Sequence, residues 1–118
     1  EGAQAAPMFK LNNLIAFTDY NKMQLDGYIH DIMNVEDLNA KWQANGWFVQ
    51  RVNGHDFFDL NMAIERAHKE KIRPVMIIMD TIKGKGCSFA ERLVSNHNMT
   101  FDYEKAKEAI RLLDNRGN

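Results

Sequence analysis

Three short segments rich in apolar, β-branched and aromatic residues constrain the fold of this chain more than any other feature. They are residues 14–17 (Leu-Ile-Ala-Phe), 47–52 (Trp-Phe-Val-Gln-Arg-Val) and 75–79 (Val-Met-Ile-Ile-Met). Segments this short are typical of buried strands. Longer stretches with helical spacing separate them, and strands that alternate with helices form parallel sheets. The sequence therefore predicts an α/β fold, a parallel sheet with helices on both faces.

Capping residues and apolar stripes predict the positions of the helices. Asn34 is the expected N-cap of one helix, which Gly46 ends, and Asp56 is the expected N-cap of the next. The alanine-rich N-terminus predicts the end of a further helix, in which Pro7 indicates a kink or a late start. The expected helices span residues 1–10, 35–45, 57–71 and 103–113.

The remaining segments predict loops. Polar residues 18–21 directly follow the first strand, and Asp26-Gly27 marks a turn. Residues 83–100 are rich in Gly, Ser and Asn and predict one long loop. The expected order is therefore α-β-α-β-α-β-loop-α.

Composition excludes several classes of protein. The 118 residues are enough for one domain, and 45% hydrophobic with 26% charged residues is ordinary for a globular chain. A net charge of −1 argues against a nucleic-acid-binding protein, which would carry a basic surface. No apolar run approaches the ~20 residues that cross a bilayer, so we expect no membrane segment.

The cysteine count and the N-terminus indicate the compartment. Cys87 is the only cysteine, so an internal disulfide is impossible, which fits a reducing cytoplasm. Residues 1–6 lack the basic and long apolar regions of a signal peptide. The chain does not begin with Met, which leaves open whether it is processed or lacks the start of its domain. We expect a cytoplasmic protein.

Two of the expected strands end in residues that suit a ligand. In open α/β sheets, ligands bind beyond the carboxyl ends of the strands. Asn21 follows the first strand and offers an amide oxygen for Mg²⁺ or Ca²⁺. Residues 83–86 (Lys-Gly-Lys-Gly) follow the third strand and offer cations and bare backbone N–H groups for a phosphate. Together they favour a diphosphate held by a metal ion.

Simpler interpretations of these residues, which involve no ligand, remain open. An Asn after a strand is more often a turn residue, and the glycines do not complete G-x-G-x-x-G because position 89 is Phe. None of the four histidines has the spacing of a zinc pair. His97, in the long polar loop, is the best functional candidate among them, against the commoner alternative of a solvated loop histidine.

Three stretches in combination resemble the thiamine diphosphate-binding section of transketolases. Together they cover nearly the whole chain, and the likeness is greatest to the separate N-terminal transketolase subunit found in some bacteria. It implies that residues 1–118 form the C-terminal part of a single thiamine diphosphate-binding domain. The matching stretches are Lys10–Lys22 followed by Leu25-Asp26-Gly27, Ala44–Trp47 with Asn53–Asp56, and Thr81–Gly86.

The resemblance implies a role for individual residues. Asn21 would give its side-chain oxygen, and Met23 its backbone carbonyl, to the Mg²⁺ or Ca²⁺ that holds the diphosphate. Leu25 would pack against the thiazolium region of thiamine diphosphate. Lys83 would reach toward the diphosphate. His97 would be the catalytic residue, contacting cofactor phosphate and donor substrate.

The resemblance also implies an activity and what this chain lacks for it. The activity is transfer of a two-carbon ketol unit between sugar phosphates, as in the pentose phosphate pathway. The Gly-Asp-Gly motif that supplies the other metal ligand would lie upstream of Glu1, and Glu1 itself would match a carboxylate at a dimer interface. The pyrimidine-binding domain, with its catalytic glutamate, would come from a C-terminal subunit or domain in a dimeric assembly. These 118 residues alone are therefore expected to be inactive.

Two alternatives stay open. One is a related thiamine diphosphate enzyme of the deoxyxylulose phosphate synthase or dihydroxyacetone synthase type. The other is a non-catalytic α/β assembly subunit that has kept the fold without the chemistry.

Overall fold

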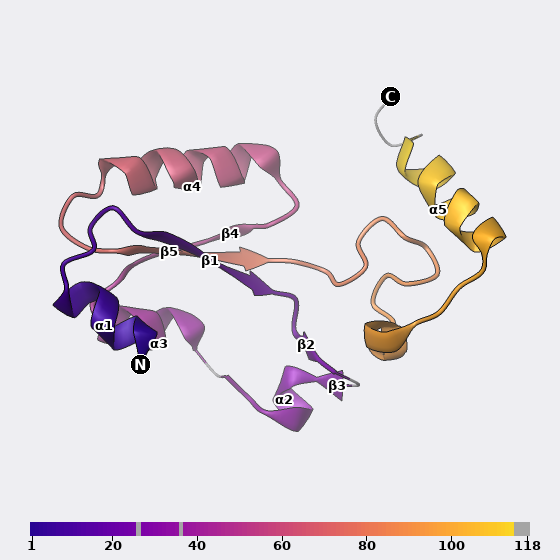
Figure 1. The fold of residues 1–118 in the computed structure, drawn as a ribbon, viewed down its shortest axis with the longest axis horizontal. Helices are drawn as coiled ribbons and strands as arrows, with labels where there is room; N and C mark the ends of the chain where they lie inside the picture. The colour runs from indigo at the N-terminus through magenta and orange to yellow at the C-terminus, as the bar shows by residue number, and fades with distance from the viewer. Residues whose placement is uncertain (26, 36, 115–118) are drawn as a thin grey trace. The chain divides into compact units, whose positions relative to one another are not determined.

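The computed structural model describes residues 1–25, 27–35 and 37–114, and these form two compact units (Figure 1). We call Glu1–Asn21 with Val35–Thr81 the sheet unit. We call Lys22–Asn34 with Ile82–Asn118 the hairpin unit. Within the described residues, no helix combines the length and the apolar character that crossing a membrane requires.

The sheet unit is built on three parallel strands. They are β1 (Ile15–Tyr20), β4 (Phe48–Asn53) and β5 (Val75–Asp80), in the order β1-β5-β4. The central strand β5 begins with four buried apolar residues, as expected for a strand that is covered on both faces. Its partners are in register, so that Ile15 and Phe48 both lie beside Val75. The predicted parallel sheet is confirmed.

Helices cover both faces of this sheet (Figure 1). On one face α4 (Phe57–Lys69) packs Ala63 and Ala67 against a cluster that contains Val75 and Ile77. The other face carries α1 (Gly2–Met8) and α3 (Leu38–Ala44), packed around Trp47, Met76 and Ile78. Alternate residues of β5 thus face opposite helices, as the pleat of a strand requires. The prediction of helices on both faces is confirmed.

Pro7 lies inside the last turn of α1, which begins at Gly2, so the helix does not start late. A proline at this position cannot donate to the carbonyl of Ala3, one turn earlier. The indole N–H of Trp47 donates to that carbonyl instead, at 2.7 Å. A tertiary hydrogen bond therefore replaces the helical one that Pro7 removes.

Two predicted boundaries in the sheet unit are wrong for a clear physical reason, and α1 and α4 also end earlier than predicted, at Met8 and Lys69 rather than at residues 10 and 71. Helix α3 begins at Leu38 rather than at residue 35, and Asp37 caps it in place of Asn34 by accepting the N–H of Ala40 at 3.1 Å. Strand β1 continues to Tyr20, through residues predicted as loop, because pairing with β5 satisfies their backbone. The expected stop at Gly46, with φ +88°, and the Asp56 cap of α4 are confirmed.

The hairpin unit contains short elements that the sequence did not predict. Strands β2 (Met23–Gln24) and β3 (Gly27–Tyr28) pair antiparallel and lead into α2 (Ile29–Ile32). The expected turn falls partly on Asp26, which lies outside the described residues. The predicted loop 83–100 contains a short 3₁₀ helix, η1 (Val94–Asn98). The terminal helix is confirmed as α5 (Tyr103–Asp114).

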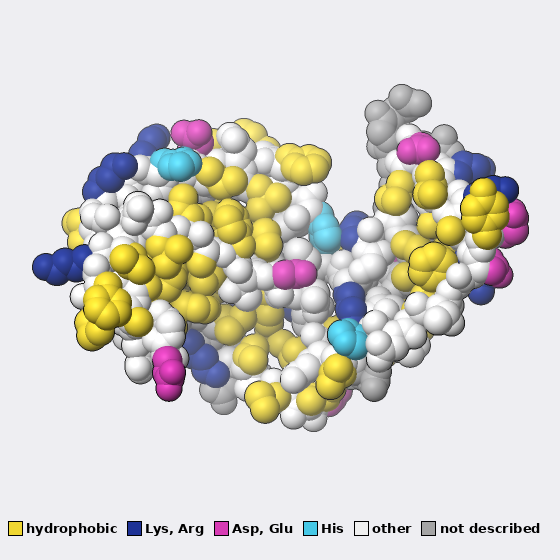
Figure 2. Space-filling view, in the orientation of Figure 1, with side chains coloured by type: hydrophobic (Ala, Val, Ile, Leu, Met, Phe, Trp, Pro, Cys, Tyr) yellow, Lys and Arg dark blue, Asp and Glu magenta, His cyan; other side chains and the backbone are white. Residues whose placement is uncertain are grey.

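Apolar side chains of the hairpin unit remain exposed. Figure 2 shows them over α5, between acidic and basic side chains. Tyr103, Ile110 and Leu113 are at least half exposed, and α5 contains no buried residue.

Candidate functional site

The three strands of the sheet unit end at one edge. Tyr20, Asp80 and Asn53 lie level with one another, because β1 and β4 both run parallel to β5. Asn21 follows β1 directly and Thr81 follows β5. The structure thus places Asn21 at the carboxyl edge of the sheet, where α/β proteins bind ligands.

An ion pair holds the ends of β4 and β5 together at this edge. Arg51 donates from Nε to Oδ2 of Asp80 at 2.6 Å and from Nη2 to Oδ1 at 2.8 Å. Its guanidinium also lies over the ring of Tyr20, 5.2 Å from the centroid. The hydrogen bond with Asp80 raises the pKa of Arg51 above its ordinary value. Arg51 therefore touches the last residues of both other strands.

Thr81 and Gly54 connect the same strand ends through one side-chain and two backbone hydrogen bonds. The Thr81 hydroxyl donates to the carboxylate of Asp19, and its N–H donates to the carbonyl of Tyr20 at 3.3 Å. The N–H of Gly54 donates to the carbonyl of Asp80 at 2.9 Å. A Cβ at position 54 would lie 2.5 Å from Cγ2 of Thr81, so this contact requires glycine. Tyr20, the residue preceding Asn21, is thus held by Thr81 at its carbonyl and by Arg51 at its ring.

In the hairpin unit, Met23 lies between two residues with left-handed backbone. Lys22 has φ +68° and Leu25 has φ +49°, although neither is glycine. Such conformations cost free energy and cluster at ligand sites. The Leu25 side chain is 55% exposed and can contact a bound molecule. The predicted metal ligand and the predicted apolar contact thus share one strained hairpin.

Lys83 and His97, two predicted site residues, lie together in the hairpin unit. Nζ of Lys83 is 3.5 Å from Nδ1 of His97, which η1 carries. An ammonium donating to Nδ1 leaves the proton of a neutral imidazole on Nε2. With that tautomer, the pair presents a cationic ammonium and an imidazole N–H to a ligand.

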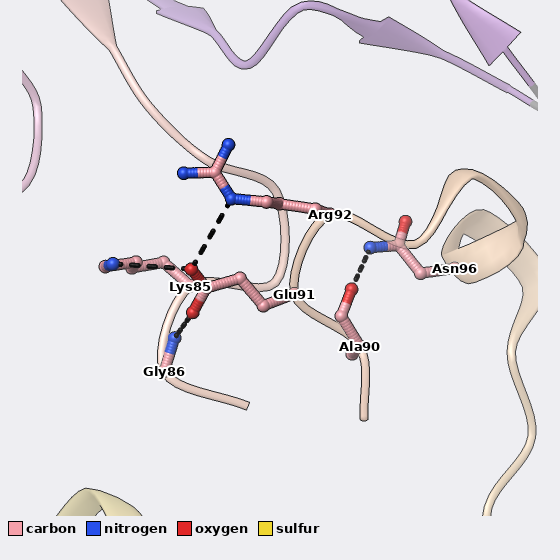
Figure 3. Close-up of polar contacts among 6 residues, drawn as sticks. All are labelled: Lys85, Gly86, Ala90, Glu91, Arg92 and Asn96. Atoms are coloured by element: carbon pink, nitrogen blue, oxygen red, sulfur yellow. Dashed lines mark hydrogen bonds and ion pairs between the residues drawn. The ribbon is translucent and has the colours of Figure 1, made fainter. Parts of the chain in front are cut away.

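The expected phosphate cradle of bare N–H groups at residues 83–86 is wrong at Lys85, whose N–H donates to the carbonyl of Ile82 at 3.1 Å, and at Gly86. The Gly86 N–H donates to Oε2 of Glu91 at 3.1 Å, and Nζ of Lys85 lies 3.4 Å from Oε1 of the same carboxylate (Figure 3). Gly84 has φ +74°, and a Cβ there would lie 2.7 Å from the carbonyl oxygen of Ala90. The loop thus uses this donor for its own closure, a contact that the G-K-G pattern does not reveal.

Asn21 of the sheet unit carries an oxygen donor in its side-chain amide, and Met23 of the hairpin unit carries one in its backbone carbonyl. Oxygen donors are the ligands that Mg²⁺ and Ca²⁺ prefer. Within residues 1–25, 27–35 and 37–114, no group of three or more His, Cys, Asp or Glu could hold a metal ion. The oxygen donors of Asn21 and Met23 are each of the type that a magnesium or calcium ion takes.

Comparisons with known proteins agree on one family. The family model described as "Transketolase, thiamine diphosphate binding domain" matches residues 1–113. Over 117 residues the chain is 45% identical to the 6-deoxy-6-sulfo-D-fructose transketolase subunit SqwG of Clostridium sp. (strain MSTE9), covering 99% of this chain and 42% of that protein. It is 32% identical over 116 residues to an apulose-4-phosphate transketolase subunit of Phocaeicola vulgatus (strain ATCC 8482), covering 98% of this chain and 41% of that one.

A solved structure shows the same fold. The crystal structure of transketolase from Campylobacter jejuni superposes with a TM-score of 0.83 at 30% identity, covering 92% of this chain and 17% of that one. The chain thus spans about two fifths of the length of the two subunits above.

Proposed function

Because the chain belongs to the family of transketolase thiamine diphosphate-binding domains, we propose that it is the cofactor-binding part of a transketolase. The reaction is transfer of a two-carbon ketol unit between sugar phosphates in the cytoplasm. Residues 1–118 are then the C-terminal part of a single cofactor-binding domain.

The contact between Lys83 and His97 carries this proposal. Each residue matches a different part of the family pattern, and their side chains lie 3.5 Å apart. Two N–H donors at this separation can bind the oxygen atoms of one diphosphate. An assembly subunit without chemistry would have no need to keep such a pair.

In this proposal, the site residues bind different parts of the cofactor and its metal ion. Asn21 Oδ1 and the carbonyl of Met23 bind Mg²⁺ or Ca²⁺, and Lys83 binds the diphosphate. Leu25 packs against the thiazolium and excludes water from it. When bound, thiamine diphosphate supplies the stabilisation of a carbanion. His97 donates a hydrogen bond to phosphate and to the donor substrate, where it stabilises charge or moves a proton.

The chain depends on other parts for activity. It spans about two fifths of relatives that are themselves named as subunits. We propose that the rest of the domain supplies the other metal ligand, and that a C-terminal subunit supplies the pyrimidine-binding side in a dimeric assembly. These 118 residues alone then neither bind the cofactor firmly nor turn over substrate.

Calorimetric titration with thiamine diphosphate and Mg²⁺ tests the proposal on three samples. They are the 118 residues, the full-length protein, and the full-length protein with its C-terminal partner. We expect binding and turnover of a ketose phosphate donor with an aldose phosphate acceptor only in the third sample, and loss of both on chelation of the metal. Turnover by the 118 residues alone, or no binding by the complete assembly, would contradict the proposal.

Asn21→Leu in the complete assembly tests the metal site. The loss of an oxygen ligand should weaken metal-dependent cofactor binding by about tenfold or more, without unfolding the sheet. Asn13→Leu is the matched control, because Asn13 is an exposed asparagine preceding the same strand. Equal cofactor affinity in the two variants would remove Asn21 from the site.

A further inference from the structure

Residues 83–92 of the hairpin unit form a closed loop. The carbonyl of Lys83 accepts the N–H of Arg92 at 3.2 Å, so the two ends of the loop meet. The carbonyl of Cys87 accepts the N–H groups of Ala90 and Glu91 at 3.0 and 2.8 Å. Arg92 has φ +62°, a strained value for a residue with a side chain. The surrounding hydrogen bonds therefore hold the loop in a conformation that its sequence does not favour locally.

The carboxylate of Glu91 is the central side chain of this loop (Figure 3). It accepts the N–H of Gly86 at 3.1 Å, and Lys85 Nζ and Arg92 Nε lie 3.4 and 3.9 Å away. Its side chain is only 22% exposed. The Gly86 N–H is the main reason that the pKa of Glu91 is lowered, so the carboxylate is charged at neutral pH. One side chain thus ties the first half of the loop to the second.

The second half of the loop then holds η1. The carbonyl of Ala90 accepts Nδ2 of Asn96 at 2.8 Å, as Figure 3 shows, and the N–H of Leu93 at 3.2 Å. His97 is the next residue after Asn96. On the other side, the Ala90 carbonyl lies against Gly84, which adjoins Lys83. Ala90 therefore links the two segments that carry Lys83 and His97.

We propose that Glu91 is a positioning residue for the Lys83–His97 pair. It touches neither side chain. Its hydrogen bond to Gly86 fixes the loop, the loop places Ala90, and Ala90 holds Gly84 beside Lys83 and Asn96 beside His97. The reach of the carboxylate to the Gly86 N–H is what matters, more than its charge. Only the identity of the ligand that the pair binds rests on the proposed function.

Two conservative variants of Glu91 separate the effect of side-chain length from the effect of the negative charge. Glu91→Gln keeps an oxygen acceptor at the same distance and loses the charge, whereas Glu91→Asp keeps the charge and is one methylene shorter. Glu104→Asp is the matched control, because Glu104 also lies 3.4 Å from a lysine, Lys107, but on the exposed surface of α5. Both substitutions at position 91 are small, so the assembly should still fold.

The first readout is cofactor affinity, measured by calorimetry with thiamine diphosphate and Mg²⁺ on the full-length protein with its partner. Residues that support a site typically change affinity by about 10- to 100-fold. We expect Glu91→Asp to weaken binding by about tenfold at an unchanged melting temperature, and Glu91→Gln and Glu104→Asp to stay within about twofold. Equal affinity in Glu91→Asp and Glu104→Asp, or weakening in Glu91→Gln alone, would overturn the proposal.

The second readout needs no cofactor. Nuclear magnetic resonance of ¹⁵N-histidine-labelled protein reports the ring nitrogens of His97, assigned through a His97→Gln variant. Glu91→Asp should shift the Nδ1 resonance by altering the contact with Lys83, and Glu91→Gln should not. If the wild type binds no thiamine diphosphate, the proposed function fails, and this spectrum alone decides the role of Glu91. An unchanged His97 resonance in Glu91→Asp would overturn that role.

Discussion

The buried apolar residues of the described chain all lie in the sheet unit, where β5 is covered by helices on both faces. In the hairpin unit, by contrast, α2, η1 and α5 contain no buried residue, and polar contacts such as the Glu91–Gly86 hydrogen bond hold its loops. Yet Met23, Leu25, Lys83 and His97, four of the five proposed site residues, lie in the hairpin unit. The residues that stabilise the fold and those proposed to bind the cofactor are thus largely separate.

This separation has a physical consequence. Apolar burial stabilises a unit whether or not a ligand is present, whereas loops held by hydrogen bonds with few buried apolar contacts open at lower cost. We expect substitutions in the core of the sheet unit to change the free energy of unfolding, and substitutions in the hairpin unit to change binding or turnover.

His97→Ala in the complete assembly should have the largest effect that the comparison predicts. If His97 moves a proton or stabilises charge, its loss should lower turnover by about 10² to 10⁴-fold and leave the melting temperature unchanged. His68→Ala is the matched control, because His68 is exposed on α4 of the sheet unit. Steady-state kinetics and thermal unfolding of both variants measure the two effects. A turnover equal to that of His68→Ala would exclude a catalytic role.

Ile77→Ala should have the opposite profile. Ile77 is fully buried in β5, so its truncation leaves a cavity and should lower the free energy of unfolding by roughly 2–5 kcal/mol. Ile110→Ala in α5 removes the same atoms from a side chain that is 59% exposed, and should cost less than about 0.5 kcal/mol. Urea denaturation of the full-length protein gives both values. Similar losses would show that α5 is packed as tightly as the sheet.

Sequence patterns could predict the sheet unit because its signals are local. Four buried residues in β5, the Asp56 cap and the glycine at position 46 each leave a mark within a few positions of the chain. The boundary error in β1 arose where a tertiary contact overrode local preference, because its polar end pairs with β5. The error at the start of α3 was a choice between two local caps, Asn34 and Asp37. The packing order of the strands leaves no such local mark.

Sequence could identify the candidate site residues through resemblance, but not the contacts between them. Arg51 and Asp80 are 29 positions apart, and their pairing requires that β4 lie beside β5. The hairpin around Met23 depends on left-handed backbone at Lys22 and Leu25, which neither residue type favours. The Gly86 N–H was expected to be free because the pattern does not show that Glu91 folds back onto it.

Gly54→Ala and Gly84→Ala compare the two units by adding the same methyl group to each. At position 54 the added Cβ meets Thr81 and Met79 within the sheet unit, and should lower the free energy of unfolding by about 1–3 kcal/mol. At position 84 it meets the Ala90 carbonyl and requires φ +74°, so it should open the loop of the hairpin unit.

Hydrogen exchange measured by mass spectrometry separates the two outcomes. Gly84→Ala should speed exchange in residues 83–97 while the strands stay protected, and Gly54→Ala should speed exchange in the strands. Gly2→Ala is the control for both, because nothing lies within 4 Å of its Cβ position. Faster strand exchange in Gly84→Ala would mean that the two units unfold together.

Low pH should produce the smallest effect, and it probes one glutamate in each unit. Glu70 accepts the N–H of Ile72 at 2.9 Å beside β5, and Glu91 accepts the N–H of Gly86. These hydrogen bonds, the largest cause in each case, lower the pKa of both glutamates below the ordinary 4.5. A lowered folded-state pKa means that the stabilisation is complete above pH 4.5 and is lost as the pH falls through the lowered value.

The two turns should respond differently once their carboxylates are protonated. The Ile72 turn is continuous with the buried start of β5, so its amide should keep its protection from exchange. The Gly86 amide should lose only a small part of its protection, after correction for the intrinsic effect of pH on exchange, because a protonated carboxyl still offers an oxygen acceptor at the same reach. Side-chain carboxyl resonances should meanwhile titrate below pH 4.5 in both. Complete loss of Gly86 protection at acid pH would show that the charge of Glu91, and not the reach of its side chain, closes the loop.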